Sequence, residues 1–301
     1  MLGPTASGKS TTAEAVASQF DACILSVDSM QVYRGMDVGT AKPSLETRQS
    51  IPHHLIDVAD VSEHFSVAEF QRQGRAVLEK AGAAGDRVVV AGGSGLHFRA
   101  LVDPMTFPPT DVAIRRELEE ATFEELQEIL IAVDQAAPDV LDFQNPRRVI
   151  RAIEVWRITG LTPSERANTP ESDALREYRP TVPHVSLGFD PGDHSGERIE
   201  ARFARMLDDG LVAEVEALAP RFGRTAAQAV GYRELLGFIR GTSTLKAATE
   251  AAVRATRGLV KRQRTFFRRD PRIQWMAWQD GEDARIEAVV NRIGEAAGWT
   301  L

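Results

Sequence analysis

Hydrophobic and polar positions along the chain follow two periods that alternate. Short apolar runs, which are typical of buried strands, occur at residues 22–27, 87–91, 182–189 and 273–278. Helical spacing of apolar positions is found between and after them, at residues 11–20, 67–83, 199–207, 254–268 and 284–297. Strands that alternate with helices predict an α/β fold with a parallel sheet flanked by helices.

The pattern changes in the middle of the chain. Pro104, Pro108 and Pro109 interrupt it, and residues 111–168 carry helical segments without a convincing strand. We therefore expect an inserted all-helical subdomain at residues 104–181. The catalytic core would then consist of residues 1–103 and 182–301.

The N-terminal ten residues contain a phosphate-loop motif, with two glycines five apart followed by lysine and a hydroxyl. Backbone N–H groups of such a loop converge on phosphate oxygens, the lysine adds a positive charge, and the hydroxyl can ligate Mg²⁺. The motif predicts a site for a di- or triphosphate, such as ATP; a glycine-rich turn before a helix is the alternative. The predicted phosphate-binding residues are Gly3, Pro4, Thr5, Ala6, Ser7, Gly8, Lys9 and Ser10.

A phosphate loop normally follows a buried strand, and here only Met1 and Leu2 precede it. We therefore expect the first strand of the sheet to be truncated.

Two further segments follow predicted strands, where a parallel sheet presents functional groups at its carboxyl edge. Asp28 follows the run at 22–27 and is a candidate for chemistry, although it could simply cap the next turn. Gly92-Gly93-Ser94-Gly95 follows the run at 87–91. These glycines allow a ligand to approach the backbone, but they are equally compatible with a tight turn that binds nothing.

Composition narrows the class of protein. The 301 residues are 43% hydrophobic and 26% charged, as is ordinary for a soluble globular protein. Cys23 is the only cysteine, so no intrachain disulfide forms. No leader peptide and no apolar run of about 18 residues is found, so we expect a cytoplasmic protein without a membrane segment.

The formal net charge of −7 argues against indiscriminate nucleic-acid binding, but basic residues cluster locally. One cluster, Arg147, Arg148 and Arg151, lies near the start of a predicted helix, where cations are poorly placed against the helix dipole. The other places five cations on one helix face, at Arg254, Arg257, Lys261, Arg264 and Arg268. Both clusters are compatible with an anionic partner or with a solvated basic face.

Together these segments resemble the tRNA dimethylallyltransferases, also called tRNA isopentenyltransferases, over nearly the whole chain. The resemblance rests on Gly-Pro-Thr-Ala-Ser-Gly-Lys-Ser at 3–10, Val-Asp-Ser-Met-Gln-Val-Tyr at 27–33, Gly-Thr-Ala-Lys-Pro at 39–43, Pro-His-His-Leu-Ile-Asp at 52–57, Gly-Gly-Ser-Gly-Leu at 92–96, Val-Gly-Tyr-Arg-Glu at 230–234 and Lys-Arg-Gln at 261–263. It implies a P-loop NTPase-like fold. It also implies transfer of a dimethylallyl group from dimethylallyl diphosphate to N6 of the adenosine immediately 3′ of the anticodon, with release of diphosphate.

The same resemblance implies roles for individual residues. Asp28 would be the catalytic base. Ser10 and Arg233 would act on the departing diphosphate, and Ser10 would also hold Mg²⁺. The helical insertion would contact the tRNA anticodon stem-loop. The implied tRNA contacts are Asp28, Ser29, Met30, Gln31, Ser94, Arg115, Arg147, Arg148, Arg151, Lys261, Arg262, Gln263, Arg264, Thr265 and Phe266.

Two rival functions fit parts of the sequence. One is a phosphate-loop kinase for nucleotides or small molecules, with the cations at 254–268 as an arginine lid. The other is a non-catalytic RNA-binding protein that keeps an unused loop. We expect the protein to be a monomer.

Overall fold

The computed structural model describes residues 1–279 and 281–299, which fold as two compact units. The first unit comprises residues 1–102 and the described residues from 182 onward, and the second comprises residues 103–181. Each unit has its own hydrophobic core.

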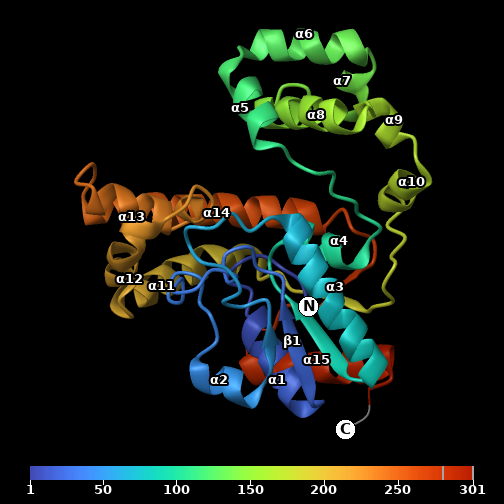
Figure 1. Cartoon of the computed structure of the whole chain (residues 1–301). Helices are drawn as coiled ribbons and strands as arrows, with labels where there is room; N and C mark the ends of the chain where they lie inside the picture. Colours follow the sequence, from blue (N-terminus) through green and yellow to red (C-terminus); the bar gives the residue numbers. More distant parts are fainter. Residues whose placement is uncertain (280, 300–301) are drawn as a thin grey trace. The chain divides into compact units, whose positions relative to one another are not determined.

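The first unit contains a parallel sheet and most of the helices (Figure 1). Its elements in chain order are α1 (Lys9–Gln19), β1 (Ala22–Ser26), α2 (Leu45–Ser50), β2 (His53–His54), α3 (Val67–Ala84), β3 (Arg87–Ala91), α4 (Gly95–Val102), β4 (Ser186–Gly188), η1 (Gly192–His194), α11 (Ser195–Asp208), α12 (Leu211–Leu218), η2 (Ala219–Arg221), η3 (Ala226–Gln228), α13 (Tyr232–Ile239), α14 (Leu245–Phe267), β5 (Ile273–Trp275) and α15 (Glu282–Ala297), where η denotes a 3-10 helix.

All strand pairs in the unit are parallel, which confirms the predicted α/β fold. β1 lies between β2 and β3, and β4 pairs with β5. Leu2 connects the two sheets, because it forms parallel bridges to Gly92 on one side and to Gly188 on the other. Its N–H donates to Leu187 O at 2.8 Å, and Leu2 is fully buried. A single residue thus occupies the centre of the sheet, where a full strand is expected.

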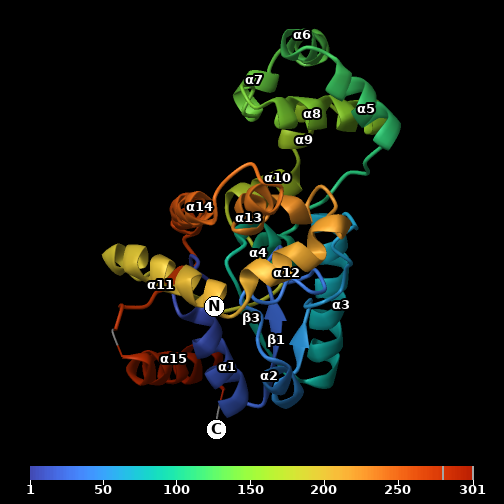
Figure 2. The ribbon, with the colours of Figure 1, turned by 90° about the vertical axis from the view of Figure 1, so that its left-hand side faces the viewer.

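Both faces of the sheet are covered, which explains why its strands read as continuous apolar runs. Successive strand residues point to opposite faces. Ile24 accordingly packs in the cluster that includes residues of α1 and α15, whereas Leu25 packs in the cluster that includes residues of α3 and α4. Figure 2 shows α3 on one side of β1 and β3, with α1 and α15 on the other.

Helices α11, α12, α13 and α14 pack against one another and lie beyond the carboxyl ends of the strands (Figure 2). Their apolar side chains, including Phe203, Leu211 and Tyr232, belong to the same cluster as Leu25 of the sheet. A layer of helices therefore faces the sheet edge at which the sequence predicted functional groups.

The second unit is entirely helical in its regular structure. Its elements are α5 (Val112–Glu120), α6 (Phe123–Val133), α7 (Ala137–Val140), α8 (Pro146–Thr159), α9 (Pro163–Ala167) and α10 (Pro170–Arg176). Leu118 of α5, Leu130 of α6 and Ile153 of α8 meet in its core. Among the described residues of the whole chain, no helix has the length and apolarity that crossing a bilayer requires.

A buried carboxylate organises the second unit. The Glu154 side chain is inaccessible to solvent and contacts Arg151 at 2.6 Å and Arg115 at 2.8 Å. It also accepts the Asp111 N–H at 3.1 Å. Burial alone would raise the pKa of Glu154, but the hydrogen bonds and the two arginines lower it below its usual value.

We expect Glu154→Gln to destabilise the second unit by about 1–3 kcal/mol, because the substitution leaves two arginines without their shared charge. Chemical denaturation of the full chain at pH 7 measures the effect. Glu117→Gln removes an exposed ion pair to Arg157 and should cost less than about 1 kcal/mol. Equal effects of the two substitutions would contradict the role assigned to Glu154.

Candidate functional site

The phosphate loop has the backbone geometry of an anion-binding turn. Ala6 and Gly8 both have positive φ, 64° and 78°, immediately before α1 begins at Lys9. The loop therefore directs backbone N–H groups and the helix N-terminus toward one point. The Ser7 hydroxyl is buried and has no hydrogen-bond partner among the described residues. A buried polar atom without a partner is costly, so this hydroxyl suits a loop that closes around a polar ligand.

Two half-buried cations lie beside this loop. Lys9 Nζ donates to Pro4 O at 3.2 Å, and Arg202 of α11 lines the same hollow beside the loop. Desolvation, and then repulsion from Arg202, lower the pKa of Lys9 to about 8. Burial likewise lowers the pKa of Arg202, while the charge of Asp28 raises it. Arg202 forms no hydrogen bond or ion pair with the residues that the structure describes. Lys9 and Arg202 repel each other, and an anion bound beside both of them would stabilise the pair.

Asp28 lies two residues beyond the end of β1. One carboxylate oxygen, Oδ1, accepts the backbone N–H groups of Met30 at 2.8 Å and Gln31 at 3.3 Å. These bonds fix the carboxylate at the carboxyl edge of the sheet. Asp28 also lines the cavity described next, so the predicted capping role and a role in a ligand site are compatible.

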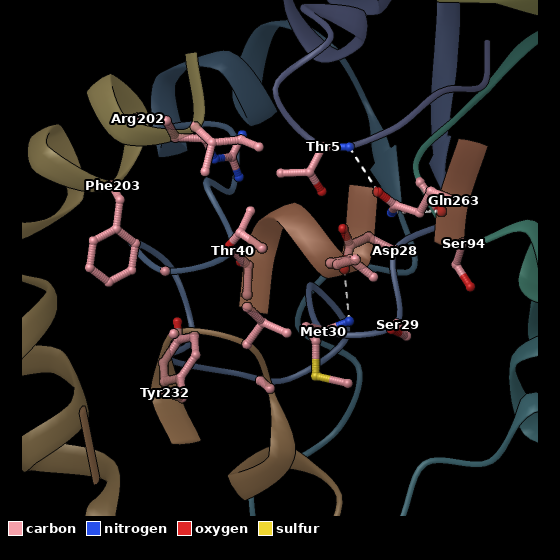
Figure 3. Close-up of a pocket in the computed structure, with 18 of the residues that line it drawn as sticks. Thr5, Asp28, Ser29, Met30, Thr40, Ser94, Arg202, Phe203, Tyr232 and Gln263 are labelled. Carbon is pink, nitrogen blue, oxygen red and sulfur yellow. Dashed lines mark hydrogen bonds between the residues drawn. The ribbon is translucent and has the colours of Figure 1, made fainter. Parts of the chain in front are cut away.

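A cavity of about 410 Å³ lies between the sheet edge and the helices α11–α14. Thr5, Asp28 and Thr40 line it from the loops, and Arg202 and Phe203 line it from α11 (Figure 3). Met206, Leu211, Val230 and Tyr232 add apolar surface. The cavity therefore combines a carboxylate, a cation and an apolar wall.

A second hollow, of about 740 Å³, adjoins the phosphate loop. Loop and helix residues 6–11 line it, together with Arg198, Arg202 and Arg205 of α11. Arg198 Nε donates to Ala6 O at 2.7 Å, which holds the positive-φ residue of the loop in place. Because Arg202 lines both hollows, a ligand could place an anionic group beside the phosphate loop and an apolar group in the first cavity.

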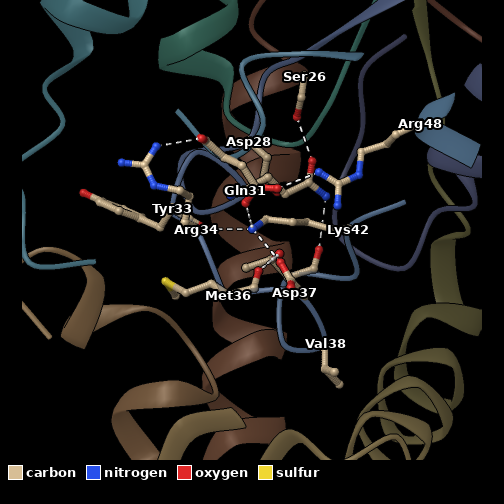
Figure 4. Close-up of polar contacts among 12 residues, drawn as sticks. Ser26, Asp28, Gln31, Tyr33, Arg34, Met36, Asp37, Val38, Lys42 and Arg48 are labelled. Carbon is tan, nitrogen blue, oxygen red and sulfur yellow. Dashed lines mark hydrogen bonds and ion pairs between the residues drawn. The ribbon is translucent and has the colours of Figure 1, made fainter. Parts of the chain in front are cut away.

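The loop from Asp28 to Pro43 is held by an internal polar network (Figure 4). Lys42 Nζ, whose side chain is 1% exposed, contacts Asp57 at 2.5 Å, Asp37 at 2.7 Å and Tyr33 O at 2.6 Å. Arg48 contacts the other oxygen of Asp57 at 2.5 Å. These ion pairs fix the segment that carries Asp28.

The predicted residues Gln31 and Gln263 use their amides within the protein. Gln31 accepts the Ser26 hydroxyl at 2.8 Å and donates to Thr40 O at 3.2 Å. Gln263 accepts the Thr5 N–H and donates to Gly93 O, each at 2.9 Å. Both side chains position loops of the site, a role that their residue type alone does not reveal.

Several other predicted residues surround the first cavity. Ser29, Met30, Ser94, Arg262 and Phe266 all line it. The Ser94 hydroxyl lies 2.6 Å from Nδ1 of His97, which is buried against Phe70. Desolvation lowers the pKa of His97 to about 4, so the ring is neutral near pH 7. The ring of Phe266 is 37% exposed and forms an aromatic surface at the cavity.

The remaining predicted tRNA-binding residues differ in whether their side chains are exposed or held in ion pairs. Arg264 contacts Asp190 at 2.7 Å, whereas Lys261 and Thr265 are exposed on α14. In the second unit, Arg115 and Arg151 are bound to Glu154, and Arg147 and Arg148 are exposed at the start of α8.

Arg233, which the sequence predicts as a site residue, lies outside both hollows, whereas Arg202 lines both. Arg233 Nε donates to Glu234 at 3.0 Å, its side chain is 52% exposed, and it lines neither hollow. Arg202 was not among the predicted residues. Arg202 lies three positions after Ile199 and four before Met206 on the same helix, so it is at the border of the apolar face. This spacing is the feature of the sequence that could have indicated it.

Metal binding would rely on few protein ligands. No cluster of three or more histidine, cysteine, aspartate or glutamate side chains suited to a metal ion occurs in the described part of the chain. Ser10 is exposed in the first turn of α1, beside the phosphate loop. Such a hydroxyl suits Mg²⁺, which commonly keeps its waters and binds through substrate phosphates.

Fold and site together define a phosphate-loop α/β enzyme with an apolar subsite. The family model for IPP transferase matches residues 31–270. The chain therefore belongs to the IPP transferase family.

Curated relatives agree with this assignment. The tRNA dimethylallyltransferase of Salinispora tropica is 43% identical over 92% of this chain and 86% of its own length, and that of Bifidobacterium longum is 40% identical over 92% and 85%. The solved tRNA isopentenylpyrophosphate transferase of Bacillus halodurans has a TM-score of 0.71 and 33% identity, and the alignment covers 98% of this chain and 94% of that one. A eukaryotic dimethylallyltransferase has a TM-score of 0.76 at 21% identity, which extends the likeness in fold.

Proposed function

We propose that the protein transfers a dimethylallyl group from dimethylallyl diphosphate to N6 of the adenosine immediately 3′ of the anticodon in tRNA. The observation that carries this proposal is a pair of adjoining hollows: Lys9 and Arg202 line the one beside the phosphate loop, and Arg202 and Asp28 line the one that has an apolar wall. An allylic diphosphate needs a cationic site, an apolar site and a base for the attacking amine.

Asp28 serves as the general base. The N6 lone pair of adenine is delocalised into the ring, so the amine is a weak nucleophile unless its proton is removed during attack. As the bond from N6 to C1 of the donor forms, the bond from C1 to the diphosphate oxygen breaks. The electron pair leaves with diphosphate, and the N6 proton passes to Asp28.

The phosphate loop, Lys9 and Arg202 receive the leaving group. Negative charge grows on the departing oxygen, and the loop N–H groups, Lys9 and Arg202 stabilise it. We assign to Arg202 the role that the family resemblance gave to Arg233. Ser10 would hold Mg²⁺, which neutralises diphosphate charge when it is bound.

The RNA approaches from the side of Ser94 and Phe266. The adenine must leave the stack of the anticodon loop, at a cost of a few kcal/mol, and the exposed Phe266 ring offers a replacement stacking surface. Lys261 and Arg262 on α14, and Arg147 and Arg148 on α8, supply cations for RNA phosphates.

The proposal is tested by incubating the protein with radiolabelled dimethylallyl diphosphate, Mg²⁺ and unmodified tRNA. Label recovered as N6-dimethylallyladenosine supports it. Absence of label together with ATP-dependent phosphorylation of a small molecule would favour a kinase instead, and absence of both with retained tRNA binding would favour a non-catalytic RNA-binding role.

The lowered pKa of Lys9 predicts how donor binding depends on pH. Diphosphate binds the ammonium form, and in the free protein this form is lost as pH rises through about 8. We therefore expect donor affinity to decrease above pH 8, by up to about tenfold per pH unit. Titration calorimetry between pH 7 and 9.5 measures it. Lys9→Arg stays charged over this range and should remove the decrease; an unchanged pH dependence in that variant would contradict the assignment.

A further inference from the structure

The apolar wall of the first cavity ends at Tyr232, a residue that has no part in the proposed reaction. Tyr232, at the start of α13, is fully buried and lines the cavity together with Gly39. A Cβ atom added to Gly39 would lie 2.4 Å from Cε2 of the Tyr232 ring. The ring is therefore in direct contact with the backbone of the loop that carries Asp28 and cannot move toward it.

Glu214 of α12 holds both sides of this contact. Its carboxylate accepts the backbone N–H groups of Asp37, Val38 and Gly39 at 2.9, 2.7 and 3.1 Å. It also accepts the Tyr232 hydroxyl at 2.5 Å. Four hydrogen bonds on one carboxylate thus join the loop to the tyrosine, so the wall is fixed on two sides.

The position of this wall determines what it can touch. Polar groups lie at other sides of the cavity: Asp28 and Thr5 come from the loops, and Gln263 comes from α14 (Figure 3). Phe203, Met206 and Leu211, which are all buried, form the apolar side that continues to Tyr232. A hydrocarbon chain bound through its diphosphate at the phosphate loop can pack against this continuous apolar side, which ends at Tyr232.

We infer that Tyr232, fixed by Glu214 and Gly39, sets the maximum chain length of the allylic donor by closing the apolar end of the cavity. This inference rests on the proposed function and deepens it. On this inference, a five-carbon dimethylallyl group fits in front of the ring, and the second isoprene unit of a geranyl group does not. Rejection arises because a fixed aromatic ring in a packed wall cannot be displaced without strain.

The experiment compares kcat/KM for dimethylallyl diphosphate and geranyl diphosphate with the same tRNA. The natural protein should prefer the shorter donor by roughly 100-fold or more, because even one methylene can change kcat/KM by about tenfold. Tyr232→Ala opens the wall and should reduce this preference at least about tenfold. Tyr232→Phe keeps the ring and loses only the hydroxyl, so it should retain the preference.

A structural role of Tyr232 would lower kcat/KM for both donors and leave their ratio unchanged, which would overturn the inference. If Tyr232→Ala fails to fold, Tyr232→Leu, which keeps part of the volume, replaces it, and an unchanged ratio in that folded variant again overturns the inference. Failure of the natural protein to transfer dimethylallyl to tRNA would refute the proposed function itself, so the two failures are distinguishable.

Discussion

Asp28→Asn should lose dimethylallyl transfer by about 10²- to 10⁴-fold while binding tRNA and donor almost normally. The asparagine side-chain oxygen can still accept the N–H groups of Met30 and Gln31, so the loop keeps its conformation. What disappears is the negative charge that takes the N6 proton. The variant therefore separates the base function from the positioning function of the same side chain.

Single-turnover transfer under saturating substrates measures the chemical step, and filter binding measures the affinity for tRNA. Asp21→Asn is a matched control, because Asp21 is exposed just before β1 and has a φ of 48°, which asparagine tolerates well. That variant should behave like the natural protein. Transfer by Asp28→Asn at the natural rate would remove Asp28 from the reaction.

The second large effect is expected at Arg202. Arg202→Gln should lower kcat/KM for the donor by about 10²- to 10³-fold, because the departing diphosphate loses a charged donor inside a desolvated cavity. Arg202→Lys should recover only part of this loss, since lysine lacks the planar fork that binds two oxygens.

Two arginines serve as controls for Arg202. Arg221→Gln removes an exposed cation that lines neither hollow and should have a small effect. Arg233→Gln tests the residue that the family resemblance suggested; with its guanidinium bound to Glu234, we expect a change of less than about threefold. If Arg233→Gln were the damaging variant and Arg202→Gln the harmless one, the assignment would be reversed.

The contrast between these arginines shows where sequence reasoning ends. The phosphate loop and Asp28 could be predicted because each is a local pattern, a motif of fixed spacing or a residue directly after an apolar run. Arg198, Arg202 and Arg205 share one amphipathic helix, and their spacing alone does not say which of them enters the cavity. That choice depends on how α11 packs over the phosphate loop, a contact between residues about 190 positions apart.

A similar limit applies to residues whose type suggested contact with RNA but whose hydrogen-bond partners could not be predicted from the sequence. Gln31, Arg115 and Arg151 have side chains suited to RNA, yet in the structure they bind backbone oxygens or a buried carboxylate. These side chains therefore form hydrogen bonds within the protein, whereas the sequence analysis expected them to contact tRNA. At the centre of the sheet, the sequence predicted a truncated first strand but did not show that Leu2 would bridge Gly92, after β3, and Gly188 of β4.

The amide of Gln263 has a thermodynamic consequence. It contacts the phosphate loop through Thr5 and the turn before Ser94 through Gly93, so one side chain of α14 is bonded to a loop at each of two proposed ligand sites. A ligand that shifts either loop changes the free energy of the shared bonds. Binding of donor and binding of RNA are then linked, and linkage is reciprocal: whatever factor the donor contributes to RNA affinity, RNA contributes to donor affinity.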